Sequence, residues 1–385
     1  MRTICAVTSN RADFSRIETM LEEIKAHPDL KLQLVVIGSH LLDVTGKTIE
    51  EIKRKGFTID RTLYMEVSGS NPTTMTKSVG LAIVELSTIF DQLQPDIVLC
   101  PVDRFESLAI GTTAAMMNIH VAHTQGGEVT GTIDESIRHA LTKMSHLHFV
   151  ASKQSKERVI KMGEIPETVF NIGCPATDLL LRAPILSRSK TIENINKEMI
   201  KTSFRLDPDK PYIFMVQHPV TTEYKNKGDQ IKETLEALNG LDEQVILLWP
   251  NIDAGADEIS HAIRLHQLSK SKKVLILKHI PTELFINVLR NASCLVGNSS
   301  CGIRESCYFG TPTVNIGSRQ SSRERGKNVL EVPYQKDAIE QAIKKQIAHG
   351  IYSVEYIYGD GTAGKQFANT CATIKLPPIQ KKITY

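Results

Sequence analysis

The residues best suited to bind an anion lie in the segment 296–320, VGNSSCGIRESCYFGTPTVNIGSRQ. The order of residue types predicts a short buried strand, a turn of small residues and then a helix. Gly297 leaves room for a close backbone approach, and the hydroxyls of Ser299 and Ser300 could donate to a diphosphate at the start of that helix. An ordinary serine cap without a ligand is the alternative.

Two charged residues of the same segment could hold other parts of a nucleotide. We expect Glu305 on the first turn or two of the helix, where its carboxylate could accept hydrogen bonds from both hydroxyls of a ribose. Arg319 follows the next expected strand and so reaches the same edge of the sheet, where its guanidinium could pair with a phosphate. Charges exposed on the surface are the alternative interpretation.

Other polar residues also follow strands. His218 comes directly after the apolar run YIFMVQ (212–217). Ligands of α/β sheets sit at the carboxyl ends of strands, which favours a functional role, whereas a hydrogen-bonded histidine before Pro219 is the alternative. Arg11 and Arg104 lie in expected loops, where arginines are often only solvated.

Two suggestive patterns are rejected. Residues 359–364, GDGTAG, match a dinucleotide-binding pattern and, with Lys365, come close to a P-loop. However, Gln366 stands where a P-loop needs Ser or Thr, and too little chain follows for a βαβ unit. We therefore expect a glycine-rich turn before a C-terminal helix.

The histidines 139, 146 and 148 cluster in the sequence, but their spacing matches no known zinc pattern, and His148 is expected at the beginning of a strand. No metal site is predicted.

The elements that must position these residues alternate between short β-branched runs and helical patterns. Buried parallel strands are expected at 3–7, 32–37, 96–100 and 120–124, and in a second series at 212–217, 244–249, 273–277, 294–297 and 313–316. The clearest helix runs from Thr74 to Leu93, with one apolar stripe that includes Met75 and Phe90. The alternation predicts doubly wound α/β sheets.

Two domains are expected because 385 residues exceed the usual size of a single core. The break DPDKP at 207–211 separates the two series of strands. We predict an N-terminal Rossmann-like domain at 1–180 and a C-terminal one at 205–364, with a helix at 365–385 that packs back on the first domain.

Composition excludes several classes of protein. Forty-six basic and forty-three acidic residues leave a net charge of +3, spread along the chain, so no nucleic-acid partner is expected. No apolar stretch is long enough for a membrane span or a secretory signal, and we expect a cytoplasmic protein. The seven cysteines include no C-x-x-C pair and are expected to be reduced thiols.

GNSSCGIRE and GTPTVNIGSRQ resemble the nucleotide-binding signature of the UDP-N-acetylglucosamine 2-epimerases. The resemblance continues in SNRADFS (9–15), DRFESLA (103–109), HTQGGEVTGTIDESIRHA (123–140), QHPVTT (217–222) and PNIDAG (250–255). SNRAD in place of G-T-R-P-E indicates the hydrolysing branch. The resemblance implies the two-domain arrangement called GT-B, with the active site in the cleft between the Rossmann-like halves.

Residue by residue, the resemblance implies one group of residues that binds UDP and the sugar, and a second group that carries out catalysis. UDP is bound by Ser299, Ser300, Glu305 and Arg319, with help from Asn251; Arg11 and Arg104 reach the diphosphate and the sugar. Asp103, Asp134 and His218 match catalytic residues of the family, although Asp134 could alternatively be only an acid at a helix N-terminus.

The reaction implied is UDP-N-acetylglucosamine and water to N-acetylmannosamine and UDP, through a 2-acetamidoglucal, as the first step of sialic acid synthesis. Carboxylates would move protons and fixed cations would stabilise the departing diphosphate, so no cofactor is required.

The sequence departs from the family pattern at Gln125, where H-x-E-G-G is expected. An amide still hydrogen-bonds but exchanges no proton, which would lower the rate by roughly 10² to 10⁴. An engineered change, a natural variant in which Glu128 takes the role, and a tolerated loss are the three explanations. A smaller departure, Pro101 and Val102, precedes Asp103.

Competing functions remain open. The motifs do not separate UDP-N-acetylglucosamine from UDP-N,N′-diacetylbacillosamine. A glycosyltransferase of the same fold and a catalytically impaired UDP-sugar-binding protein are further alternatives. The implied partners are the UDP-sugar, UDP and further copies of the chain in a homodimer or homotetramer.

Overall fold

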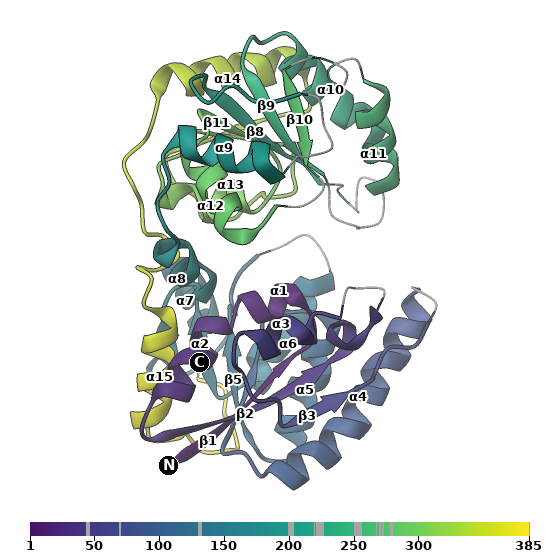
Figure 1. Cartoon of the computed structure of the whole chain (residues 1–385). Coiled ribbons are helices and arrows are strands. Elements are labelled where there is room, and N and C mark those ends of the chain that lie inside the picture. Colours follow the sequence, from purple (N-terminus) through teal and green to yellow (C-terminus); the bar gives the residue numbers. More distant parts are fainter. Residues whose placement is uncertain are drawn as a thin grey trace. The chain divides into compact units, whose positions relative to one another are not determined.

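The computed structural model describes residues 1–43, 47–68, 71–129, 133–198, 204–218, 220, 227–249, 256–266, 268, 271, 273–277 and 280–384. The chain divides into two compact units (Figure 1). The first comprises Met1–Leu181 and Tyr358–Tyr385, and the second comprises Arg182–Ile357.

A parallel sheet of seven strands forms the centre of the first unit, in the order β3-β2-β1-β4-β5-β6-β7. The order reverses between β1 and β4, which creates the crevice where α/β proteins bind ligands. The strands are β1 (Arg2–Thr8), β2 (Leu30–Ile37), β3 (Arg61–Leu63), β4 (Ile97–Cys100), β5 (His120–Thr124), β6 (Leu147–Val150) and β7 (Val169–Asn171).

Helices cover both faces of this sheet, so successive residues of a strand enter different cores. In β1, Ile4 and Ala6 pack in one core while Cys5 and Val7 pack in the other. Burial on both faces explains the nearly continuous apolar runs. The helices are α1 (Arg11–Ser15), α2 (Glu18–Ala26), α3 (Ile49–Arg54), α4 (Pro72–Leu93), α5 (Phe105–Met116), α6 (Ile133–Met144), α7 (Lys153–Lys161) and α8 (Pro175–Arg182), with 3-10 turns η1 (Gly38–Leu41) and η3 (Pro166–Thr168).

Helix α4 begins two residues earlier than its apolar stripe predicts, because Asn71 caps its first turn. Asn71 Oδ1 accepts from Thr74 N at 3.1 Å, and Thr74 Oγ1 accepts from Asn71 N at 3.2 Å. Leu86 and Phe90 are fully buried as the stripe requires, but Met75 remains 38% exposed. Met75 therefore lies outside the core and lines a cavity described below.

The C-terminal segment returns to the first unit. Helix α15 (Ala363–Thr373) follows the glycine-rich turn, as predicted, and buries Phe367 and Cys371 beside α2 (Figure 1). The helix ends at Thr373, earlier than the predicted 365–385, and the chain continues without regular structure.

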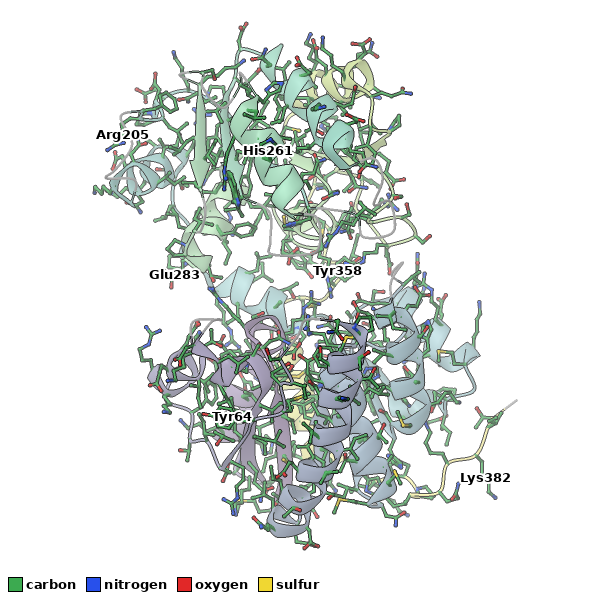
Figure 2. The ribbon with its side chains drawn as sticks, turned by 90° about the vertical axis from the view of Figure 1, so that its right-hand side faces the viewer. Tyr64, Arg205, His261, Glu283, Tyr358 and Lys382 are labelled. Carbon is green, nitrogen blue, oxygen red and sulfur yellow. The ribbon has the colours of Figure 1, made fainter. Side chains whose placement is uncertain are left out.

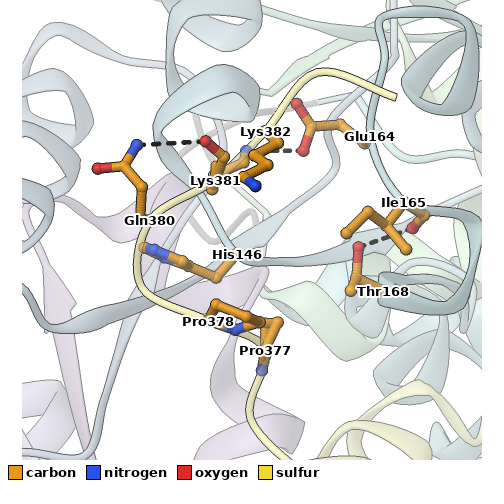
Figure 3. A pocket seen from close by; sticks show the side chains of 9 residues that line it. All are labelled: His146, Glu164, Ile165, Thr168, Pro377, Pro378, Gln380, Lys381 and Lys382. Carbon is orange, nitrogen blue, oxygen red and sulfur yellow. Dashed lines mark hydrogen bonds and ion pairs between the residues drawn. The ribbon is translucent and has the colours of Figure 1, made fainter. Parts of the chain in front are cut away.

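This C-terminal tail closes a cavity of about 430 Å³ at the amino edge of β6 (Figure 3). Lys381 Nζ pairs with Glu164 Oε2 at 2.6 Å and donates to Lys143 O at 2.9 Å. His146 Nε2 donates to Ile379 O at 3.0 Å. These contacts fix the tail at the edge of the sheet opposite the ends of β1 and β4.

The second unit holds a parallel sheet of six strands in the order β10-β9-β8-β11-β12-β13, which reverses between β8 and β11. Its strands are β8 (Tyr212–Val216), β9 (Gln244–Leu248), β10 (Val274–Leu277), β11 (Cys294–Gly297), β12 (Thr313–Ile316) and β13 (Val329–Val332). Its helices are α9 (Arg188–Glu198), α10 (Lys227–Asn239), α11 (Ala256–Leu265), α12 (Thr282–Asn291), α13 (Cys301–Arg304), the 3-10 turn η6 (Ser306–Tyr308) and α14 (Lys336–His349).

The two faces of the second sheet are also covered. Ile213 and Met215 of β8 pack with α10, α11 and α14, while Phe214 meets Phe285 of α12 edge-on. Figure 2 labels His261 on α11 and Glu283 on α12. Helix α9, which precedes the DPDKP break, belongs to this unit and packs on α12.

The predicted fold class, two Rossmann-like α/β sheets, is confirmed. Every expected strand is present, whereas β3, β7 and β13 were not predicted because each is short and weakly apolar. All seven cysteines are free and buried. Within the described ranges, no helix combines the length and the hydropathy needed to cross a bilayer.

Candidate active site

The crevice of the first unit collects the polar residues that follow β1 and β4. Arg11 opens α1 directly after β1 and is exposed. Asp103 and Arg104 follow β4, and the Asp103 side chain is 15% exposed. Because β1 and β4 are paired neighbours, both loops leave the sheet at the same place.

A buried arginine, Arg138 of α6, holds Asp103. Its Nε donates to Asp103 Oδ2 at 3.0 Å, and its Nη2 pairs with the same oxygen. Its Nη1 donates to Glu128 O at 2.7 Å. Arg138 is 1% exposed, so one side chain joins the loop after β4 to the loop after β5. Both contacts with the carboxylate fall on Oδ2, and Oδ1 takes part in neither.

The sequence analysis did not identify Arg138 as a site residue. An arginine three residues after Glu135 on an amphipathic helix gives no sign that it is buried.

A buried histidine, His123, holds the backbone of the loop before Asp103 by a hydrogen bond. Val102 has a left-handed backbone with φ of 51°, and its carbonyl accepts from His123 Nε2 at 2.7 Å. Its N–H donates to Thr124 Oγ1 at 3.2 Å. Burial above all lowers the pKa of His123 to about 3, so the ring is neutral and donates from Nε2. The departure at Pro101 and Val102 is thus accommodated by β5.

Gln125, directly after β5, is buried and also left-handed, with φ of 59°. Its Oε1 accepts from Arg16 Nη1 at 2.6 Å, and its Nε2 contacts Cys174 Sγ at 3.7 Å. Its N–H donates to Phe149 O at 2.7 Å. Gln125 Oε1 therefore faces the Arg16 guanidinium. A glutamate carboxylate at this position would face the same positive charge.

Arg104 is held by a buried carboxylate that the sequence analysis missed. Its Nε lies 3.2 Å from Oε2 of Glu106, which is 1% exposed. Asp134, on the first turn of α6, also acts electrostatically on Arg104. Glu128 is buried. The structure thus places Asp103 and the backbone of Glu128 at Arg138, and Glu106 and Asp134 near Arg104.

A further acid, Asp13, lies on α1 two residues after Arg11 and was not predicted. Its Oδ2 accepts from Asn10 Nδ2 at 2.8 Å and from Ser9 Oγ. Burial, and then the charge of Glu106, raises the pKa of Asp13 to about 7.

The crevice of the second unit forms between β8 and β11. Gly297 at the end of β11 has φ of 137°, and an added Cβ would lie 2.0 Å from Val216 O, so only glycine fits. The next residue, Asn298, is fully buried and binds the backbone of His218. Burial, and then the charge of Arg319, lowers the pKa of His218 to about 4.

The strand, turn and helix expected in the segment 296–320 are present, but the helix is shorter than expected. Helix α13 spans only Cys301–Arg304, because the chain tightens into the 3-10 turn η6. Ser300 is its N-cap residue and makes no side-chain cap. Ser299 Oγ accepts from Cys301 Sγ at 3.2 Å.

Glu305 ends α13 instead of lying within a longer helix. Its Oε2 is buried and has no hydrogen-bond partner among the described residues. Such an acceptor is costly to leave unpaired, which fits a ligand hydroxyl. Arg319 Nη1 donates to Asn298 O at 3.2 Å, on the same crevice as His218. Asn251 lies outside the described residues.

The rejected histidine cluster makes three separate sets of contacts. His148 Nε2 lies 3.0 Å from Glu164 Oε2, His146 binds the tail, and His139 lies 3.5 Å from Glu135. Within the described ranges, no group of three His, Cys, Asp or Glu side chains could hold a metal ion.

Comparison with known proteins agrees with this geometry. The sequence model described as UDP-N-acetylglucosamine 2-epimerase matches residues 22–372. A UDP-N,N′-diacetylbacillosamine 2-epimerase (hydrolyzing) of Legionella pneumophila is 34% identical over 98% of this chain and 97% of its own. A UDP-N-acetylglucosamine 2-epimerase of Neisseria meningitidis is 32% identical over 96% and 94%.

Solved structures show the same fold. The UDP-GlcNAc 2-epimerase from Neisseria meningitidis, bound to UDP-GlcNAc, superposes with a TM-score of 0.77 at 17% identity, covering 96% of this chain and 99% of that one. The enzyme from Methanocaldococcus jannaschii, in complex with UDP-GlcNAc and UDP, gives a TM-score of 0.73 at 14% identity, with coverage of 96% and 99%.

Proposed function

The chain belongs to the UDP-N-acetylglucosamine 2-epimerase family, and from this membership we propose that it is a hydrolysing 2-epimerase of a UDP-linked 2-acetamido sugar. With UDP-N-acetylglucosamine and water, the products are N-acetylmannosamine, a precursor of sialic acids, and UDP. The observation that carries the proposal is the carboxylate of Asp103, oriented by buried Arg138 beside the loop of Glu128.

The proposed reaction has two steps. In the first, a carboxylate takes the proton from C2, the bond between C1 and the UDP oxygen breaks with its electrons going to UDP, and a C1–C2 double bond forms. In the second, water adds its hydroxyl to C1, and a proton reaches C2 from the opposite face. Asp103 suits one proton transfer because Arg138 occupies Oδ2 and not Oδ1. Asp134 is proposed for the other.

Cations and a neutral imidazole serve the departing UDP. Arg11 and Arg104 are proposed to contact the diphosphate and the sugar, where fixed positive charge stabilises the leaving group. Ser299, Ser300 and Arg319 are proposed for the nucleotide, with Glu305 accepting from the ribose through its unpaired Oε2. His218 is neutral at pH 7 because its pKa is lowered, so it can donate or accept one hydrogen bond.

Two substrates are supported by relatives. UDP-N-acetylglucosamine is named for the Neisseria relative and UDP-N,N′-diacetylbacillosamine for the Legionella relative, at similar identity. Both reactions use the same bonds at C1 and C2. The identity of the sugar depends on residues that contact the rest of the ring.

The test is turnover of each UDP-sugar in heavy water. We expect UDP and a free sugar that carries deuterium at C2, since the proton at C2 is exchanged with solvent. Asp103→Asn, which keeps size and removes the base, should lower UDP release by roughly 10² or more. A free sugar without deuterium at C2 would identify simple hydrolysis, and a need for an acceptor would identify a glycosyltransferase. Binding of UDP without turnover, even after Gln125→Glu, would identify a binding protein.

A further inference from the structure

A second cavity, of about 750 Å³, opens on the first unit beside the crevice. Its walls come from η1 after β2, the segment after β3, the first turn of α4 and the start of α5. The strand ends that precede these walls lie at the carboxyl edge of the sheet, where the proposed catalytic residues also lie. The cavity is therefore at the same edge of the sheet as the proposed catalytic residues.

Arg104 connects the cavity to the reacting carbons. It lines the cavity and is the immediate neighbour of Asp103 along the chain. Its guanidinium is turned to Glu106, another lining residue, at 3.2 Å. A sugar ring with C2 at Asp103 would thus extend past Arg104 toward the cavity.

The lining combines three kinds of group. Glu66 supplies a carboxylate acceptor, Ser68 supplies a hydroxyl, and Val67 and Met75 supply apolar surface. An acetamido group offers an N–H donor, a carbonyl acceptor and a methyl, and so matches all three. A ring hydroxyl uses only the polar groups and leaves the apolar wall in contact with water.

We propose that this cavity receives the ring substituent remote from C1 and C2 and selects a sugar with a second acetamido group there over one with a hydroxyl. The inference rests on the proposed function and deepens it. UDP-N,N′-diacetylbacillosamine carries such a second group, whereas UDP-N-acetylglucosamine does not.

Hydrogen bonds within the chain hold the walls of the cavity in place, which lowers the ordering cost of binding. Val67 N donates to Ser78 Oγ at 2.9 Å, and Ser78 Oγ donates to Thr74 O at 3.0 Å, so the segment after β3 is tied to α4. Gly38 has φ of 61°, and a Cβ there would lie 3.4 Å from Glu66 Oε1. The loop after β2 therefore packs closely against Glu66.

The test is calorimetric binding of both UDP-sugars and of UDP to the full chain and to two cavity variants. The parent should bind UDP-N,N′-diacetylbacillosamine at least about tenfold more tightly than UDP-N-acetylglucosamine. Met75→Trp, which places a larger ring at the apolar wall of the cavity, should remove most of this preference and leave the Kd of UDP within about twofold. Leu81→Trp, at an exposed position of the same helix, is the matched control and should keep the preference.

Glu66→Ala removes a hydrogen-bond acceptor from an exposed position. It should also lower the affinity for UDP-N,N′-diacetylbacillosamine more than the affinity for UDP-N-acetylglucosamine. The inference would be overturned if the parent bound both UDP-sugars with equal affinity, or if Met75→Trp lowered the affinity for both UDP-sugars by the same factor. Because the readout is binding, absence of turnover bears on the proposed function alone. If UDP and both sugars fail to bind, the proposed function and this inference both fall.

Discussion

Asn298 holds both backbone polar groups of His218. Its Oδ1 accepts from His218 N at 2.7 Å, and its Nδ2 donates to His218 O at 2.9 Å. The carbonyl of Asn298 in turn accepts from Arg319 Nη1 at 3.2 Å and from Gln320 Nε2 at 3.0 Å. A single buried residue after β11 thus contacts the proposed histidine through its side-chain amide and the proposed phosphate-binding arginine through its backbone carbonyl.

Replacing this amide should lower stability and activity together. Asn298→Ala leaves the N–H and the carbonyl of His218 without these partners, and each unpaired buried group costs roughly 1–3 kcal/mol. We expect a lower free energy of unfolding in urea and a kcat/KM for UDP release that falls by about tenfold or more. Asn298→Asp keeps an acceptor for His218 N but sets a buried carboxylate oxygen against His218 O, so it should also lower stability and activity. Equal kcat/KM in parent and Asn298→Ala would show that this contact does not matter.

Arg138 should be among the most costly residues of the first unit to replace. Arg138→Met leaves the Asp103 carboxylate without its buried cation, and breaking a buried pair from one side costs about 3–5 kcal/mol. Urea unfolding measures the loss, with Arg54→Met, an exposed arginine of α3, as the control. Adding Asp103→Asn to Arg138→Met should recover part of the loss because the uncompensated charge is gone. Strict additivity of the two changes would contradict the pairing.

Restoring a carboxylate at position 125 should raise activity. Arg16 Nη1, 2.6 Å from Gln125 Oε1, would pair with a glutamate in the same place. If an acid or base is missing, Gln125→Glu should raise the rate of UDP release by roughly 10² to 10⁴. Gln154→Glu, exposed on α7, is the control. An unchanged rate would favour Glu128 as the residue that takes the role.

Asp13 predicts a stability that changes with pH. Its pKa is raised to about 7, first by burial and then by Glu106, so the protonated form is favoured in the folded chain. Protonated Asp13 contributes fully to the stability of the folded chain below its unfolded pKa, near 3.8. This contribution is lost as the pH rises through the folded pKa of about 7. Asp13→Asn does not titrate and escapes that loss.

The free energy of unfolding of Asp13→Asn should therefore rise relative to that of the parent between pH 5 and pH 8. The expected rise is roughly 1.4 kcal/mol for each pH unit between pH 5 and the folded pKa of Asp13. Urea unfolding at both values measures the difference, with exposed Asp91→Asn as the control. A difference that is constant with pH would contradict the raised pKa of Asp13.

The fold class followed from the sequence because strands buried on both faces need long apolar runs, and such runs stand out. The runs at 3–7 and 212–217 became the central strands β1 and β8. The short edge strands β3, β7 and β13 were not predicted from the sequence because a strand at the edge of a sheet needs little apolar surface. Met75 was misplaced because helical periodicity shows a stripe but not where the core beneath it ends.

The sequence by itself determined the family, the two alternating α/β series and the loops that carry Asp103, His218 and Ser299. Those properties depend on local order along the chain. Only the tertiary structure decided that Arg138 joins Asp103 to Glu128, that Asn298 holds His218, and that Gln125 faces Arg16. Each of these contacts joins residues 10 to 109 positions apart, and their burial arises from packing that no local pattern records.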